Sequence, residues 1–313
     1  MKYSLKAQSD IWTGNASGSD DYLCWTGMKG SLRWWYEALI RGLNGYACDP
    51  TSREKGDRCE FDTKSYKKTK DLDSELMKIC PACRLFGCTG WSSKIRLKIT
   101  DDKQIILNKR ISKDDLFRID LIPIKNIDDA EKTLLAMAVR IMVEYGSVGG
   151  KTVFKPSEKD EKQKKPNHRD YGLLQWAENP DPAASAAAIG KYNLKCTGKE
   201  HGDNNPEWPD FKYFWFVRGT YIDRLTHNDL VGRDTYNSKN YLTNASPEQE
   251  WLGGDLGSNS KKAISKKIFS FHSANRCWGY TKRNKNMFDT LIAELAGKGF
   301  KSIEKGEDIL NAL

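Results

Sequence analysis

Apolar residues between positions 31 and 45 recur at the spacing of an amphipathic helix. They form one stripe at i, i+3, i+4, i+7, i+8 and i+11, made of Leu32, Trp35, Tyr36, Leu39, Ile40 and Leu43. Ser31 is a natural N-cap, and Asn44 with Gly45 supplies a C-terminal stop. The pattern therefore predicts a helix over 31–43 whose stripe, with Trp35, packs into the core.

Another face of this predicted helix carries a second tryptophan. Trp34 lies about 100° further round the helix than Trp35. It shares its face with Arg33, Glu37 and Arg41. Because that face is charged, we expect it to lie outside the core. Trp34 would then contact a ligand or a neighbouring chain, or pack under the loop at 14–22.

Further patterns predict more elements in the first half of the chain. Residues 1–13 alternate like a strand, and 94–111 are typical of a hairpin of two alternating runs around Asp101-Asp102. A second helix is predicted over 129–145, with a stripe of Leu134, Ala138, Ile141, Met142 and Tyr145. The order strand, helix, strands, helix fits a split β-α-β unit of ferredoxin-like type.

The pattern breaks over 151–205 and returns after it. Residues 155–170 are mostly charged and 179–190 are low in complexity, which indicates a linker or flexible insertion. An aromatic-rich strand is predicted at 211–222, a strand pair at 266–283, and a helix with a short strand at 286–303. We therefore predict an α+β protein with one domain at 1–150, which has an insertion at about 48–83, and a second domain at 206–313.

The amino-acid composition of the chain indicates a candidate binding partner. The chain has 313 residues, with 51 Lys and Arg against 42 Asp and Glu, and a net charge of +9. Ten tryptophans contribute to an aromatic content of 11%. Because phosphates need cations and bases need flat faces, this combination favours nucleic acid as a partner. An ordinary basic globular protein fits the charge equally well.

The sequence also indicates the compartment. No apolar run approaches the ~20 residues needed to span a bilayer. The first residues, MKYSLKAQSDIW, lack the apolar core of a signal peptide. We therefore expect a cytoplasmic protein without membrane contact, in which the eight cysteines are thiols or metal ligands rather than disulfides.

Several cysteines gather between positions 48 and 88. Cys80 and Cys83 have the C-x-x-C spacing of a zinc knuckle, and Cys48 and Cys59 lie in a polar stretch with no apolar content of its own. Four thiolates around zinc would hold such a segment together, so we predict a structural zinc site. Cys88 is a rival fourth ligand, and buried free thiols are another interpretation. A redox pair lacks support, because nothing places the C-x-x-C at a strand-to-helix junction.

The glycine-rich segment YGSVGGKT at 145–152 resembles a phosphate-binding P-loop only in part. A P-loop needs glycine where this chain has Tyr145, and it follows a strand rather than a helix. We therefore exclude nucleotide binding by a P-loop. What remains is a backbone that can approach a phosphodiester closely at Gly149, Gly150 and Lys151, or a helix cap followed by a turn.

The sequence contains little that predicts catalysis. The four histidines have no partner at metal-ligand spacing, and motifs of serine hydrolases, zinc proteases and calcium loops do not occur. His272, which has basic residues nearby, could act as an acid or base in RNA cleavage, and a structural histidine is the alternative. We expect neither an enzyme nor a small-molecule substrate.

Together, these motifs resemble a known family. SDIWTGNASG, the helix motif W-x-G-x-K-G-S-L-R-W-W-Y-x-A-L, CRLFGCTGW before a strand, and GSVGGKT after the second helix occur in this order. They resemble the RAMP superfamily of CRISPR proteins and, within it, the family of the first subunit of the type III-B Cmr effector complex. The motifs lie in about the first half of the chain, and the second half matches only loosely.

The resemblance implies two ferredoxin-like (RRM-related) domains that face each other across a basic cleft. It also implies a non-catalytic subunit that holds the 3′ region of crRNA, helps to engage target RNA in antiviral defence and contacts other Cmr subunits. In this superfamily LFG is commonly followed by a small residue, so Cys88 stands in for a serine. The better zinc set is then Cys48, Cys59, Cys80 and Cys83. The expected RNA-binding residues are Arg33, Trp34, Arg41, Lys94, Arg96, Gly149, Gly150 and Lys151.

Two other functions remain open. The first is a metal-independent RAMP endoribonuclease that processes crRNA precursors, with His272 and Tyr280 as its acid and base. The second is a zinc-stabilised scaffold that binds proteins without RNA contact. Metal-free cleavage of repeat RNA would favour the endoribonuclease, and binding without salt dependence would favour the scaffold.

Overall fold

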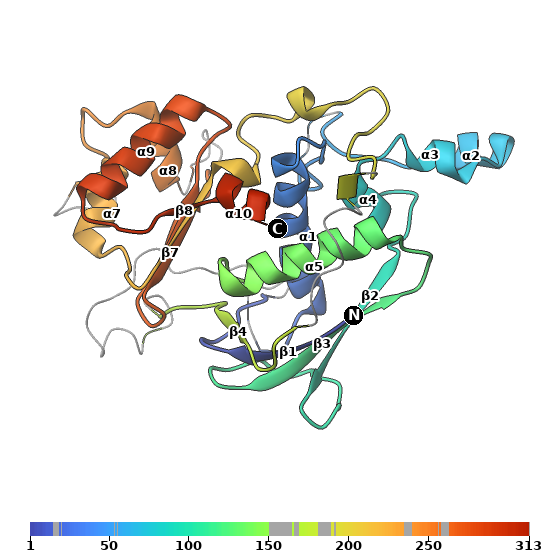
Figure 1. The fold of residues 1–313 in the computed structure, drawn as a ribbon, viewed down its shortest axis with the longest axis horizontal. Helices are drawn as coiled ribbons and strands as arrows, with labels where there is room; N and C mark the ends of the chain where they lie inside the picture. The colour runs from blue at the N-terminus through green and yellow to red at the C-terminus, as the bar shows by residue number, and fades with distance from the viewer. Residues whose placement is uncertain are drawn as a thin grey trace.

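The computed structural model describes residues 1–14, 19, 21–52, 54, 56–149, 165, 169–180, 189–190, 192–234, 240–255, 257 and 263–312. Within these residues the chain forms two four-stranded antiparallel sheets, with helices between and around them (Figure 1). None of the described helices is long and apolar enough to cross a membrane.

The first sheet contains β1 (Lys2–Ala7), β2 (Ile95–Asp101), β3 (Leu116–Pro123) and β4 (Leu174–Trp176). Their order is β2-β3-β1-β4, and each neighbouring pair is antiparallel. Alternate side chains are buried, and Leu5 of β1 lies opposite Phe117 of β3. α1 (Trp25–Gly42) and α5 (Asp129–Glu144) cover this inner face, and none of the helices drawn in Figure 1 lies on the opposite face.

The second sheet has the same strand order. It contains β5 (Phe214–Arg218), β6 (Ile268–Phe271), β7 (Arg276–Tyr280) and β8 (Glu304–Lys305), arranged as β6-β7-β5-β8. In Figure 1, α7 (Arg224–Leu230), α8 (Pro247–Gly253) and α9 (Lys285–Gly297) lie on one side of it and α10 (Gly306–Ala312) on the other. In each sheet, the first strand therefore lies between the third and the fourth.

Short helices fill the connections. α2 (Thr63–Thr69), α3 (Leu72–Leu76) and α4 (Pro81–Phe86) follow α1, and the 3-10 turns η2 (His201–Asp203) and η3 (Phe211–Tyr213) precede β5. Asp62 and Asp71 cap α2 and α3 by accepting backbone N–H bonds. α2 and α3 project from the body of the molecule in Figure 1, whereas α4 packs against α1.

α1 lies between the two sheets and belongs to the core of both. Trp35 is 1% exposed, and its ring centroid lies 5.6 Å from that of Phe214 and 5.1 Å from that of Trp278. The indole Nε1 of Trp35 donates a hydrogen bond to the carbonyl oxygen of Ser147 at 3.0 Å. The prediction that Trp35 is a core residue is confirmed, and this side chain joins α1 to the loop after α5 and to the second sheet.

α1 begins earlier than predicted. It starts at Trp25, so Ser31 lies inside the helix rather than at its N-cap. The backbone N–H of Cys24 donates to the Thr13 hydroxyl at 2.8 Å and fixes the true start. Gly27 allows the close approach there, because an added Cβ would lie 2.7 Å from the Thr13 carbonyl oxygen. The prediction failed because glycines, which are poor helix formers, precede Ser31.

The hairpin predicted at 94–111 is wrong in its second arm. β2 pairs along its length with β3, whereas residues 104–111 form only isolated bridges, one between Ile106 and Thr100 and one between Lys109 and Tyr22. Ile105 and Ile106 are 61% and 50% exposed, whereas Leu107 is buried, so the apolar pattern at 104–107 reflects burial only in part. The alternation that is buried lies in LFRIDLIP at 116–123.

Most of the other predicted helices and strands are present in the structure. The helix over 129–145 is confirmed as α5, and the strands and helix of the second half are confirmed as β5, β6, β7, α9 and β8. β4 lies inside the segment for which a linker was predicted, and it completes the first sheet by pairing with β1. The division at 150 and 206 stays a prediction.

Candidate metal centre and RNA-binding groove

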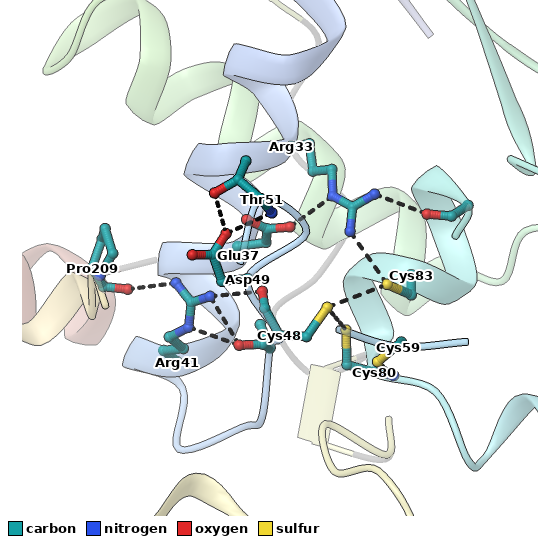
Figure 2. A network of polar contacts seen from close by, with 12 residues as sticks. Arg33, Glu37, Arg41, Cys48, Asp49, Thr51, Cys59, Cys80, Cys83 and Pro209 are labelled. Carbon is teal, nitrogen blue, oxygen red and sulfur yellow. Dashed lines mark hydrogen bonds and ion pairs between the residues drawn. The ribbon is translucent and has the colours of Figure 1, made fainter. Parts of the chain in front are cut away.

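Four cysteine thiols converge beside α1 (Figure 2). The Sγ atoms of Cys48, Cys59, Cys80 and Cys83 all lie within 4.8 Å of one another. The Sγ of Cys48 lies 3.5 Å from that of Cys83 and 3.7 Å from that of Cys80 (Figure 2). Four sulfurs around zinc at about 2.3 Å would be separated by about 3.8 Å. The sulfur positions therefore fit a tetrahedral metal with little movement.

Local structure positions each of these thiols. Cys80 is the N-cap of α4 and Cys83 lies in its first turn, with Pro81 between them at the start of the helix. Cys48 follows the left-handed turn at Asn44, which directs the chain back along α1. Cys59 accepts a hydrogen bond on its Sγ from the backbone N–H of Cys80 at 3.3 Å. The polar segment predicted to need a metal is thus attached to the core through α4.

The cluster favours the thiolate form at one of its members. Burial raises the pKa of Cys80, but hydrogen bonds from Cys48, Cys59 and Cys83 outweigh it and hold the pKa well below its usual value. The thiolate is the form that binds a metal. Cys88 lies outside the set of four mutually close ligand atoms in the described chain.

Arg33 lies beside this cluster and does not face solvent. Its Nη2 donates to the Sγ of Cys83 at 3.2 Å, its Nη1 to the carbonyl oxygen of Gly87 at 2.8 Å, and its Nε to Glu37 at 2.7 Å (Figure 2). An N–H bond to a ligand sulfur orients that ligand and offsets its negative charge. Arg33 is therefore placed to support a metal centre.

Arg41 is also an interior residue. It is 3% exposed, and its guanidinium donates to the carbonyl oxygens of Ala47, Cys48 and Pro209. The neighbouring Glu37 is 4% exposed, and burial raises its pKa to about 7 despite the two arginines. The prediction that this helix face lies outside the core is wrong, because the chain after α1 and α4 pack over it. Neither arginine is placed to contact a phosphate.

A groove lies between the two sheets. Its cavity of about 470 Å³ is bounded by the start of α1, by the loop after α5 and by the hairpin of β6 and β7. Residues from these three walls include Gly30, Ser31, Trp34, Gly149, Lys266 and Phe269. Hydroxyl, aromatic and cationic side chains therefore meet around one space.

The glycines of the groove have different physical roles. Gly149 has φ +96°, and an added Cβ would lie 2.3 Å from the Trp12 carbonyl oxygen, so only glycine fits there. Its backbone N–H donates to the hydroxyl of Ser31 at 2.9 Å. A Cβ added to Gly30 would meet nothing within 4 Å. Gly30 is therefore not required for packing, and its missing side chain leaves the groove open.

Trp34 forms part of the groove wall. Its ring meets that of Trp35 edge-on at 4.8 Å, and it lies 5.8 Å from Phe214 and 5.9 Å from Tyr280. Trp34 is half-buried and packs against the second sheet. It thus does not lie on a free helix face, and residues 15–18 and 20 of the loop at 14–22, under which it was alternatively expected to pack, lie outside the described residues. Trp34 can contact a ligand in the groove while it stabilises the packing of the two halves.

The second sheet supplies the other groove side chains. Lys266 is 7% exposed, and its ammonium lies 5.2 Å from the ring centroid of Phe269. The ring of Phe269 stacks on Trp278 with centroids 4.1 Å apart. The Nε1 of Trp278 is buried and has no hydrogen-bond partner in the described part of the chain.

The remaining predicted RNA-binding residues that the structure describes do not line this groove. Lys94 forms an ion pair with Glu131 at 2.8 Å, and its side chain is only 14% exposed. Arg96 is exposed on the face of the first sheet opposite α1. Gly150 and Lys151 lie outside the described residues. Of the predicted set, only Trp34 and Gly149 are brought together here.

Sequence reasoning missed much of the groove. Gly30, Ser31, Lys266, Phe269 and Trp278 line it and were not predicted as site residues. Two signals were present: a second glycine one turn from Gly27, and a lysine pair before the aromatic strand at 268–271. Neither signal identifies a site until the two sheets are placed side by side.

The proposed acid and base for RNA cleavage are not adjacent. His272 follows β6, and its ring packs against Tyr221 at 4.7 Å. Tyr280 ends β7, at the other end of the hairpin, where it faces the groove. The β7 strand has a rise of about 3.3 Å per residue, so its five residues place these side chains more than about 10 Å apart. The two groups do not form an acid and base pair.

Comparisons with known proteins give matches among solved structures. A search of curated proteins finds no match. Among solved structures, the chain is similar to Cmr1 from Pyrococcus furiosus in its apo form, with 10% identity, coverage of 97% of this chain and 98% of that chain, and a TM-score of 0.46. It is also similar to a chain of the type III-B Cmr-beta complex bound to cognate target RNA and AMPPnP, with 10% identity, coverage of 95% and 99%, and a TM-score of 0.47.

A family model matches the first part of the sequence. A model of the RAMP superfamily matches residues 4–154. This range includes β1, the tryptophan pair of α1, the four clustered cysteines and the glycine-containing loop after α5. The groove wall formed by Gly30, Ser31, Trp34 and Gly149 falls within it as well. Residues 4–154 of this protein are thus similar to the RAMP superfamily.

Proposed function

We propose that this chain is a non-catalytic RNA-binding subunit of a type III-B CRISPR (Cmr) ribonucleoprotein effector in the cytoplasm. In that role it holds the 3′ region of crRNA and helps to engage target RNA. The match of residues 4–154 to the RAMP superfamily and the motif order in the sequence support this assignment. The other Cmr subunits and the two RNAs are then its partners.

The groove between the sheets carries the proposal. Single-stranded RNA needs cations for its phosphates and flat faces or donors for its bases. The groove offers Lys266 and the rings of Trp34, Phe269 and Trp278 within one cavity. Its glycine wall lets a ribose-phosphate backbone approach closely. A segment of one or a few unpaired nucleotides is the ligand that fits this set.

We also propose the finer fold assignment. Each sheet has the strand order of a ferredoxin-like domain. Along the chain, each half has a first strand, a helical connection, two further strands, a helix (α5 in the first half, α9 in the second) and a fourth strand. The groove lies where the two domains meet. The basic cleft expected between them is this groove, with Lys266 as its described cation.

The four-cysteine cluster is proposed as a structural zinc site. Cys48, Cys59, Cys80 and Cys83 would fill all four positions of a tetrahedral ion, which leaves none open for substrate. Zinc there would attach the segment of α2 and α3 to α1. The site supports the fold and takes no part in a reaction.

The test is RNA binding by the whole chain and by its groove variants. The protein should co-purify with crRNA from cells that hold its native partners, and sequencing should place the protected nucleotides in the 3′ region. Lys266→Gln should weaken binding of single-stranded RNA and reduce the slope of log affinity against log salt by about 0.7. Lys301 is an exposed lysine before β8 that does not line the groove, so Lys301→Gln is the matched control. It should change neither the affinity nor the salt slope. Unaltered RNA binding by Lys266→Gln and by Trp34→Ala would contradict the groove assignment.

A further inference from the structure

The face of the first sheet that lies opposite α1 and α5 carries a group of cations. Lys2, Arg96, Lys98 and Arg118 each alternate with buried residues of β1, β2 or β3, so they lie on the outer side of the sheet. In the register of the strands, Asp120 is paired with Lys2 on one side and Lys98 on the other. Cross-strand neighbours are about 5 Å apart, so these side chains form one compact area.

Most of this positive charge is not neutralised. Within the described chain, none of Lys2, Arg96, Lys98 and Arg118 forms an ion pair, whereas the nearby Lys6 pairs with Asp114 at 2.8 Å. Asp120 is the only acidic residue at the outward positions of β1, β2 and β3. The area therefore presents an excess of cations to whatever contacts it.

Aliphatic side chains accompany these cations. Ile122 is paired with Arg96 across the strands and is 39% exposed, and Leu116 and Ile124 are 52% and 51% exposed. A cavity of about 300 Å³ between Lys2, Arg118 and Glu178 hollows the same face. Exposed aliphatic groups beside a hollow are typical of surfaces that bind another protein.

The composition of the face favours an acidic protein over single-stranded RNA as its partner. Sheets that bind single-stranded RNA present aromatic rings on which the bases stack. The outward positions of β1, β2 and β3 carry no aromatic residue. Isoleucine and leucine give bases no such platform, but they do pack against apolar side chains of a protein. A protein surface with carboxylates around an apolar centre matches both features.

We propose that this open-face patch, formed by Lys2, Arg96, Lys98, Arg118 and Ile122, docks an acidic protein surface. The partner places its carboxylates against the four cations and an apolar side chain against Ile122. The patch lies on the side of the sheet opposite α1, which forms one wall of the groove. A protein can therefore occupy the patch while RNA occupies the groove. The inference does not depend on which complex the partner comes from.

A photo-cross-linker within the patch tests this. The full chain with benzoylphenylalanine in place of Ile122 is irradiated in the native complex, with and without ribonuclease. We expect a cross-link to a protein that resists ribonuclease and maps to a peptide segment rich in Asp and Glu. The variant Arg96→Glu/Lys98→Glu should lower its yield about tenfold. Changing the cross-linked carboxylates of the partner to lysine should restore it.

A charge reversal away from the patch serves as the control. Lys67→Glu/Lys301→Glu reverses the same number of charges at two exposed lysines elsewhere and should leave the yield unchanged. A cross-link to RNA, a cross-link to a segment without acidic residues, or no cross-link would overturn the inference. A cross-linked partner that is not a CRISPR subunit would leave this inference standing and contradict the proposed function.

Discussion

The guanidinium of Arg33 in α1 donates a hydrogen bond to the Sγ of Cys83 in α4 at 3.2 Å and another to Glu37 at 2.7 Å. The arginine of the R-W-W motif thus contacts the cysteine cluster on one side of the helix, while Trp34 lines the groove on another. Neighbouring motif residues therefore serve two different sites. Four predictions follow from this arrangement and from the groove.

Replacing Arg33 with leucine should destabilise the fold and leave RNA contact alone. The change leaves the buried carboxylate of Glu37 without its closest partner, which costs about 3 kcal/mol in the free energy of unfolding. Urea unfolding measures this loss. Arg33→Leu/Glu37→Leu should recover part of it, because the uncompensated charge is then absent. Unchanged stability together with a smaller salt slope of RNA binding would instead identify Arg33 as a phosphate contact.

The purified protein should contain about one zinc per chain, since a closed four-thiolate site binds the ion tightly. Cys80→Ser removes a ligand, so elemental analysis should find the zinc lost and limited proteolysis should cut the segment of α2 and α3. Cys24→Ser, at a cysteine outside the cluster, should keep both the zinc and the resistance to protease. A metal-free wild type that resists protease would refute the site.

The two glycines of α1 should respond oppositely to alanine. Gly30→Ala adds a methyl group into open space and improves helix propensity, so stability should rise by up to about 1 kcal/mol while RNA affinity falls. Gly27→Ala places its Cβ 2.7 Å from the Thr13 carbonyl oxygen and should lower stability. Thermal unfolding and RNA titration of both variants separate the effects. RNA affinity that is unchanged in Gly30→Ala and in the larger Gly30→Gln would show that the ligand does not reach this wall.

The adjacent tryptophans should differ in the same two measurements. Trp35→Ala removes a ring that is 1% exposed and should cost about 3–5 kcal/mol of stability. Trp34→Ala removes a half-buried ring, so its stability loss should be smaller, and RNA binding should weaken by about 1–3 kcal/mol with an unchanged salt slope. Equal destabilisation by both variants with intact RNA affinity would mean that both rings serve packing alone.

The cysteine cluster could be predicted from the sequence because its signals are local. Cys80 and Cys83 have metal-ligand spacing, and the polar composition around Cys48 and Cys59 shows that the segment cannot form a core of its own. The strands were predictable wherever apolar alternation coincides with burial. In the exception at 104–111, Ile105 and Ile106 are exposed, and the pattern of one strand does not show which neighbour covers it.

The groove and the buried charges could not be predicted in this way. The groove walls come from α1, the loop after α5 and the second sheet, which are far apart in the sequence. Helical periodicity placed Arg41 and Glu37 on a charged face, and charge normally means exposure. Here the carbonyl oxygens of Ala47, Cys48 and Pro209 satisfy the guanidinium of Arg41, and that compensation depends on contacts that a helical pattern does not contain.

α1 places Trp35 against Phe214 and Trp278, so the two halves of the chain share one core. Neither half should therefore fold as an independent fragment. A fragment that ends at residue 205 would keep the first sheet and the cysteines, yet its aromatic helix face would meet water. A fragment that begins at 206 would expose the rings of β5 and β7 in the same way. Each fragment should aggregate when produced alone, and co-production should return a soluble pair. The tryptophan face of α1 thus makes this protein a candidate for split-protein complementation, with assembly of the two fragments as the readout of a correctly formed core.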